Sequence, residues 1–101
     1  MNPADPGDGT DIAQPYRSTP VFDQDNLPAA LRARHNTKDG VWGVIRVLEG
    51  ELRLTYLDPP AEMVLSPGSP GLVRPGQAHF VAPIGAMRMQ VDFYDRPPPD
   101  G

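Results

Sequence analysis

Proline and glycine interrupt the apolar part of this chain so often that long helices have no room to form. The 101 residues include 14 prolines and 10 glycines, which gather at the two ends and between short apolar runs. Proline lacks the backbone N–H that a helix interior needs, and glycine favours turns. Many short strands separated by turns satisfy this pattern. We therefore predict a single all-β domain, built as a small sandwich or closed barrel.

Several stretches show the pattern of strands. Residues 41–48 form an apolar run rich in β-branched side chains, and residues 52–56 alternate between apolar and polar positions. The Glu49-Gly50 step between them predicts a hairpin turn. Residues 87–93 alternate as well, so one face of this last strand belongs to the core. That face carries Met87, Met89, Val91 and Phe93.

The one helical candidate is residues 25–34, where alanine, leucine and arginine favour helix. Asp25 or Asn26 is suited to cap its first turn, and Leu27 and Leu31 would pack it on the body. The expected domain covers residues 15–96. It lies between two tails, residues 1–14 and 97–101, that we expect to be disordered because they offer almost nothing to bury.

Charge and composition exclude several classes of function. The net charge is −4 and no Lys/Arg cluster occurs, which argues against a nucleic-acid partner. Without cysteine the chain has no disulfide and no thiolate metal site. No apolar leader or membrane-spanning run is present, so the default expectation is a cytoplasmic protein with no membrane partner.

The two histidines mark the candidate site. The Pro75-Gly76 turn leads into His79 at the start of an apolar strand, and His35 lies far upstream. Pro75 fixes φ and Gly76 tolerates a positive φ, so the chain can reverse there. We expect the intervening strands to bring the two imidazoles together.

Residues 75–79, Pro-Gly-Gln-Ala-His, resemble the second cupin motif, in which a Pro-Gly turn presents a metal-ligating histidine. Residues 47–52 resemble the end of the first cupin motif. More closely, residues 34–43, 47–50 and 89–93 are similar to the TehB/YeaR-like family of small cupin-like domains named for tellurite resistance.

This resemblance covers roughly Tyr16 to Tyr94 and implies a small cupin-like β-barrel, or jelly roll, with one short N-terminal helix. Some members of the family precede a methyltransferase in the same chain. Because this chain ends directly after its last strand, we expect no methyltransferase domain and no methyl-transfer activity to carry over. Small barrels of this kind often pair, so a homodimer is also expected.

The metal set implied by the resemblance is incomplete here. Ordinary cupins carry a His-x-His pair and a glutamate in the first motif, whereas Asn36 and Thr37 follow His35. The available set is His35, His79 and one carboxylate, either Asp92 on the last strand or Asp39 in a loop. Such a set would suit Zn²⁺, Fe²⁺, Mn²⁺ or Ni²⁺.

The leading functional hypothesis is therefore a small cupin-like domain of the tellurite-resistance type. It would bind a divalent metal through His35, His79 and Asp92, a small anionic ligand, or both. Arginines 34, 46 and 88 would hold the anion if they converge. The alternatives are a metal-dependent enzyme of small molecules, a dioxygenase or isomerase, and a sensor or interaction module without metal.

Overall fold

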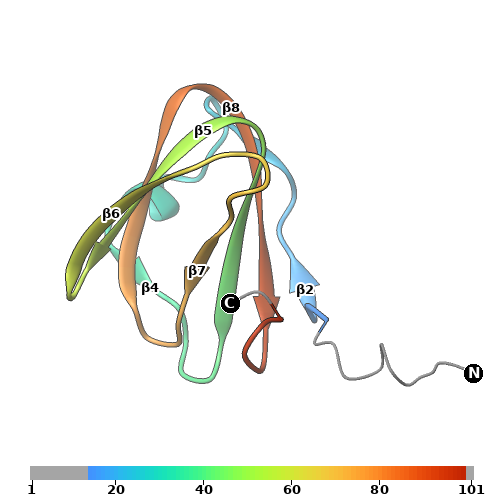
Figure 1. Ribbon diagram of the computed structural model, residues 1–101, viewed down its shortest axis with the longest axis vertical. Coiled ribbons are helices and arrows are strands. Elements are labelled where there is room, and N and C mark those ends of the chain that lie inside the picture. The colour runs from blue at the N-terminus through green and yellow to red at the C-terminus, as the bar shows by residue number, and fades with distance from the viewer. Residues whose placement is uncertain (1–13, 100–101) are drawn as a thin grey trace, which may run out of the picture.

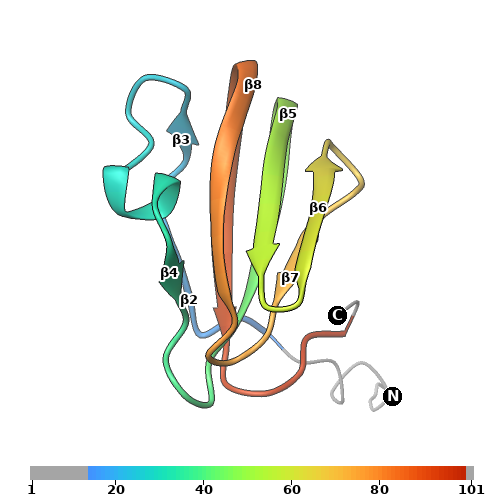
Figure 2. The same cartoon turned by 90° about the vertical axis from the view of Figure 1, so that its left-hand side faces the viewer.

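Two long strands organise the protein. The computed structural model describes residues 14–99, in which β5 and β8 pair antiparallel along their whole length, from Trp42 opposite Tyr94 to Tyr56 opposite His79. Short strands extend the sheet on both sides (Figures 1 and 2). The elements are β2 (Arg17–Ser18), β3 (Phe22–Asp23), the 3₁₀ helix η1 (Ala29–Arg32), β4 (His35–Asn36), β5 (Trp42–Leu57), β6 (Pro60–Leu65), β7 (Gly71–Val73) and β8 (Ala78–Tyr94).

The prediction of an all-β protein is confirmed. The seven strands form one antiparallel sheet with the order β2-β8-β5-β6. Strands β3 and β4 also pair with β8, and β7 also pairs with β5. Within residues 14–99 no pairing joins β2 to β6, so the sheet is open and the expected closed barrel is not confirmed.

The expected hairpin at Glu49-Gly50 is wrong, because β5 runs through this point as one strand. The register of β5 against β8 shifts on both sides of Glu49, which marks a bulge. Gly50 has φ +74°, and a Cβ at this position would lie 2.2 Å from the carbonyl oxygen of Ala86. Glycine is therefore needed for the close approach of two strands, where the sequence suggested a reversal of the chain.

The core lies on the inner face of the bent sheet. The predicted apolar face of the last strand is confirmed, since Met87, Met89 and Val91 are buried and Phe93 packs against them. The larger cluster also includes Leu27, Ile45, Val47, Leu52, Leu54, Leu65, Val73 and Val81.

The predicted α-helix at residues 25–34 is wrong. Only the four residues of η1 are helical, and the residue before them, Pro28, has an extended ψ of 139°. The Asp23 carboxylate explains the difference, because its Oδ1 accepts hydrogen bonds from the N–H groups of Asp25 (2.8 Å) and Asn26 (2.9 Å). Asp25 and Asn26, which the sequence suggested as helix caps, therefore belong to a turn that precedes the helix.

The predicted disordered tail of residues 1–14 lies, apart from Gln14, outside the described residues. Of the predicted C-terminal tail, residues 97–99 are described, and Pro98 among them is buried. No helix in the described part of the chain is long and apolar enough to cross a membrane.

Candidate functional site

The Pro75-Gly76 turn forms as predicted and fixes the start of β8. Gly76 has φ +72°, and the N–H of Gln77 donates to the carbonyl of Arg74 at 3.0 Å. Thr37 joins this turn to the loop after β4, since its hydroxyl donates to the Arg74 carbonyl (2.9 Å) and accepts from the Gly76 N–H (3.1 Å). This double contact holds β4 beside β8.

The two histidines meet, as the sequence analysis expected. His35 in β4 lies directly opposite His79 in β8, and the centroids of their rings are 4.2 Å apart at an interplanar angle of 53°. His79 is 3% exposed, whereas His35 is half-buried. The pairing of the two strands therefore places one sheltered and one accessible imidazole side by side.

Backbone carbonyls fix the orientation of both rings. The Nδ1 of His79 lies 2.8 Å from the carbonyl oxygen of Gln77, and the Nδ1 of His35 lies 3.3 Å from that of Ala33. A carbonyl oxygen only accepts, so Nδ1 carries the hydrogen in each neutral ring and Nε2 keeps a lone pair. No residue in 14–99 forms a hydrogen bond with either Nε2 atom.

Burial lowers the pKa of His79 because its charged form loses contact with water. The hydrogen bond to the Gln77 carbonyl acts in the opposite direction, and the charge of His35 lowers the pKa further. At neutral pH His79 is therefore an uncharged imidazole whose Nε2 accepts hydrogen bonds.

Acidification below pH 6.5 is expected to destabilise the fold. The unfolded chain protonates His79 near its ordinary pKa of 6.5, and the folded chain does so only at lower pH. Stability is therefore complete above 6.5 and falls as pH drops toward the folded-state pKa, by at most about 1.4 kcal/mol per pH unit for this group. Urea unfolding between about pH 7.5 and about pH 5.5 measures the slope. The His79→Phe variant should flatten this slope, and an unchanged slope would contradict the assignment.

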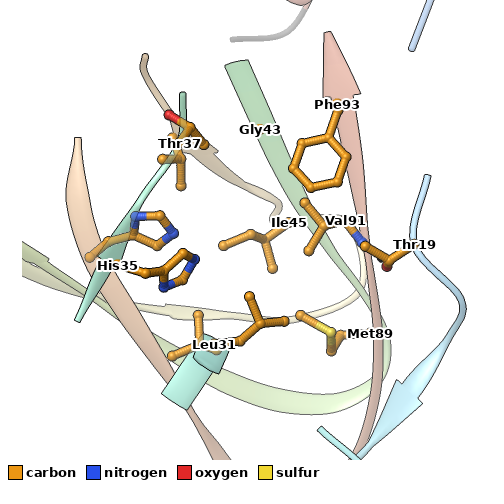
Figure 3. A pocket seen from close by; sticks show the side chains of 12 residues that line it. Thr19, Leu31, His35, Thr37, Gly43, Ile45, Met89, Val91 and Phe93 are labelled. Atoms are coloured by element: carbon orange, nitrogen blue, oxygen red, sulfur yellow. Dashed lines mark hydrogen bonds between the residues drawn. The ribbon is translucent and has the colours of Figure 1, made fainter. Parts of the chain in front are cut away.

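The histidines open onto a small apolar cavity of about 50 Å³. Figure 3 shows His35 and Leu31 pointing into it, with Val91 and Phe93 across from them. Ile45, Val73, Val81 and Met89 complete most of its wall. The arrangement offers two hydrogen-bond acceptors to a small molecule in otherwise apolar surroundings.

A wider hollow of about 270 Å³, which we call the vestibule, adjoins this cavity. The two share Leu31, His35, Thr37 and Phe93, so the vestibule leads to the imidazoles. Arg17 and Lys38 also line the vestibule. Neither cation was expected from the sequence, because β2 has only two residues and the Lys38 loop carries no periodic pattern.

Asp92 does not join the histidines. It occupies the other face of β8, where its side chain is 9% exposed and is held by neighbours on the sheet. Arg46 donates to it through Nε at 2.7 Å, and the Ser18 hydroxyl donates at 2.7 Å. Burial would raise the pKa of Asp92, but the hydrogen bonds from Arg46 and Ser18 and the charge of Arg46 together lower it.

The other polar residues singled out in the sequence also lie elsewhere. Asp39 is exposed in the loop before β5 and is not part of the cavity wall. Arg46 is engaged by Asp92, and Arg88 bonds Glu49 at 3.0 Å. Neither these two arginines nor Arg34 lines the cavity or the vestibule, so the condition under which the three would hold an anion, convergence at one site, is not met.

The chain is similar to TehB. It is 41% identical over 58 residues to the probable S-adenosyl-L-methionine-dependent methyltransferase TehB of Haemophilus influenzae, which is 54% of this chain and 20% of that protein. The crystal structure of TehB from Haemophilus influenzae matches with a TM-score of 0.75 and 32% identity, over 84% of this chain and 32% of that chain. The chain therefore spans between a fifth and a third of the length of these relatives.

A protein from E. coli (strain K12) has the same fold over nearly its whole length. Its crystal structure matches with a TM-score of 0.77 and 21% identity, covering 86% of this chain and 94% of that one. At this identity the likeness concerns the fold alone.

The comparisons and the geometry correct the metal hypothesis. The relatives are named as methyltransferases that depend on S-adenosyl-L-methionine, so the metal-binding jelly-roll cupin, its divalent cofactor and the metal-dependent enzyme are wrong. The physical reason is the missing third ligand. Among residues 14–99 no group of three or more histidine, cysteine, aspartate or glutamate side chains could hold a metal ion, and Asp92 is bound to Arg46.

The family itself follows from the match over most of the sheet. The TehB-like domain model matches residues 17–91, from the first described strand to near the end of β8. The resemblance to TehB noted in the sequence is thereby confirmed, and the chain belongs to the TehB-like domain family.

Proposed function

We propose that this chain is the ligand-holding domain of a TehB-type methyltransferase system. It binds a small molecule in the cavity between β4, β5 and β8 and so supplies the methyl acceptor. The observation that carries the proposal is the pair His35 and His79, whose Nε2 atoms offer two acceptors at an apolar cavity. Buried polar groups without a protein partner are costly, so a ligand that donates to them gains affinity.

S-adenosyl-L-methionine does not fit this cavity. A volume of about 50 Å³ lies far below the roughly 300 Å³ at which pockets begin to hold drug-sized ligands. The described residues of its wall also include no carboxylate of the kind that binds ribose hydroxyls in nucleotide sites. We infer that the methyl donor of such a system binds outside this cavity, and that the cavity holds and orients the acceptor.

A homodimer is part of the same proposal. Strand β6 stands at one end of the sheet order, and two of its side chains are exposed apolar groups, Met63 at 39% and Val64 at 48%. An unpaired edge with exposed apolar side chains favours addition of a further strand.

A domain graft tests the proposed function. The segment of Haemophilus influenzae TehB that matches this chain is replaced by this chain, and methyl transfer is followed by release of S-adenosylhomocysteine. Tellurite, for which the family is named, and a set of small alcohols, amines and organic acids are offered as acceptors in separate assays, because the cavity wall is mainly apolar. We expect the graft to remain active, and we expect the graft with His35→Phe and His79→Phe to lose at least about tenfold in kcat/KM, which corresponds to about 1.4 kcal/mol.

The graft with Arg53→Gln is the matched control, because Arg53 is exposed and lies outside the cavity and the vestibule. Circular dichroism and thermal unfolding check that each graft is folded. If a folded graft without both histidines keeps full activity, the proposal is wrong.

A further inference from the structure

The vestibule carries positive charge, although the whole chain has a net charge of −4. Arg17 and Lys38 line it, and among residues 14–99 no acidic side chain does. Within residues 14–99 neither cation has an ion-pair partner. The guanidinium of Arg17 lies 5.9 Å from the centroid of the Phe93 ring, a contact that holds it over a residue shared with the cavity. The entrance therefore attracts anions.

The apolar cavity behind the vestibule, by contrast, favours uncharged groups. Its wall is formed mostly by apolar side chains such as Ile45, Val81 and Met89, and among residues 14–99 no lysine or arginine lines it. An ion that entered it would lose its hydration without gaining a fixed opposite charge, which is strongly unfavourable. A ligand that uses both spaces therefore keeps its charge in the vestibule and places an uncharged part in the cavity.

We propose that the ligand is a small organic acid with a hydroxyl or amine group on a short carbon chain. Its carboxylate lies in the vestibule with Arg17 and Lys38, and its carbon chain fills the apolar cavity. The hydroxyl or amine donates a hydrogen bond to Nε2 of His35 or His79. The inference rests on the proposed function and names the chemical class of the acceptor that the site takes.

The volume of the cavity limits the length of the chain. A cavity of about 50 Å³ is small, so only a short carbon chain with its polar group fits inside it. In 3-hydroxybutyrate, three carbons and one hydroxyl oxygen follow the carboxylate. This compound is therefore a suitable probe.

Binding to the purified full chain is measured by isothermal titration and by the ¹⁵N shifts of the histidine rings. The probes are 3-hydroxybutyrate, butyrate without the hydroxyl, 1,3-butanediol without the carboxylate, and selenite as an inorganic oxyanion. We expect 3-hydroxybutyrate to bind at least about tenfold more tightly than each of the others and to shift the Nε2 signals. Tighter binding of selenite would overturn the organic-acid class and leave the proposed function in place, because the graft assay tests that function independently.

Charge-removing variants test the vestibule. Arg17→Gln and Lys38→Gln should each weaken the binding of 3-hydroxybutyrate at least about fivefold. Neither variant should change the affinity for 1,3-butanediol, because only the acid places a charge in the vestibule. Arg53→Gln, outside both spaces, should leave both affinities unchanged. If the two vestibule variants bind the acid as tightly as the unmodified chain, or if no probe shifts the histidine signals, the inference is wrong.

Discussion

Replacing Gly50 by alanine is expected to cost about 3–5 kcal/mol of the free energy of unfolding, a large part of the roughly 5–15 kcal/mol that is typical of a folded domain. Two effects add. The φ of +74° is unfavourable for any residue with a Cβ, and that Cβ would lie 2.2 Å from the Ala86 carbonyl oxygen. The obstacle is backbone on the partner strand, so β5 and β8 would have to separate at the bulge. Urea unfolding followed by tryptophan fluorescence measures the loss.

Gly85→Ala is the matched control for this change. Gly85 has a similar φ of +68°, but nothing lies within 4 Å of its potential Cβ. The control should therefore lose only about 1–2 kcal/mol, the cost of the left-handed backbone. Equal losses in the two variants would show that the contact between the strands at Gly50 has no energetic role.

Replacing Arg46 by methionine is expected to cost about 2 kcal/mol at neutral pH. Among residues 14–99, the change leaves the Asp92 carboxylate, whose side chain is 9% exposed, with the Ser18 hydroxyl as its one side-chain hydrogen-bond donor. Breaking a fully buried ion pair costs about 3–5 kcal/mol, and we reduce this figure because the Arg46 side chain is 43% exposed and water can replace part of it. Methionine retains most of the apolar stem of arginine, so lost packing contributes little.

The pH dependence of this loss distinguishes an electrostatic effect from a packing effect. Arg46 and Ser18 lower the pKa of Asp92 in the folded chain, so their contribution is complete above its ordinary value of 3.8. It is lost as pH falls below 3.8 through the folded-state pKa. The difference between the Arg46→Met variant and the unmodified chain should therefore be large near pH 7 and shrink near pH 3. The Asp92→Asn variant, which removes the buried charge itself, should lose less of the free energy of unfolding at neutral pH than the Arg46→Met variant. A difference that is the same at both pH values would contradict the electrostatic origin.

The parts of the fold that were predictable are those in which one local rule acts alone. The Pro75-Gly76 turn follows from the backbone preferences of its two residues, and the inner face of β8 follows from the alternation of Met87, Met89 and Val91. The meeting of His35 and His79 is the exception, because the two residues are far apart in the sequence and the prediction depended on the intervening strands bringing them together.

The remaining features depend on partners that are distant in the sequence. A glycine with positive φ serves a hairpin or a bulge equally well, and only the approach of Ala86 decides for the bulge at Gly50. Likewise, alternation predicts that Asp92 lies on the other face of the strand from Val91 and Phe93. It does not predict that Arg46 and Ser18 lie on that face and donate hydrogen bonds to Asp92. For this reason the prediction of Asp92 as a third metal ligand was wrong.

The central position of β8 has a consequence for how the chain is made. This strand pairs with β2, β3, β4 and β5, and its residues are synthesised after all four of these partner strands. Trp42 therefore cannot pair with Tyr94, its partner across the sheet, until a further stretch longer than half of the 101-residue sequence has been synthesised. Folds dominated by such distant pairings form slowly and expose their strands while incomplete. During synthesis the chain must therefore remain without its central sheet until nearly all of the domain has emerged.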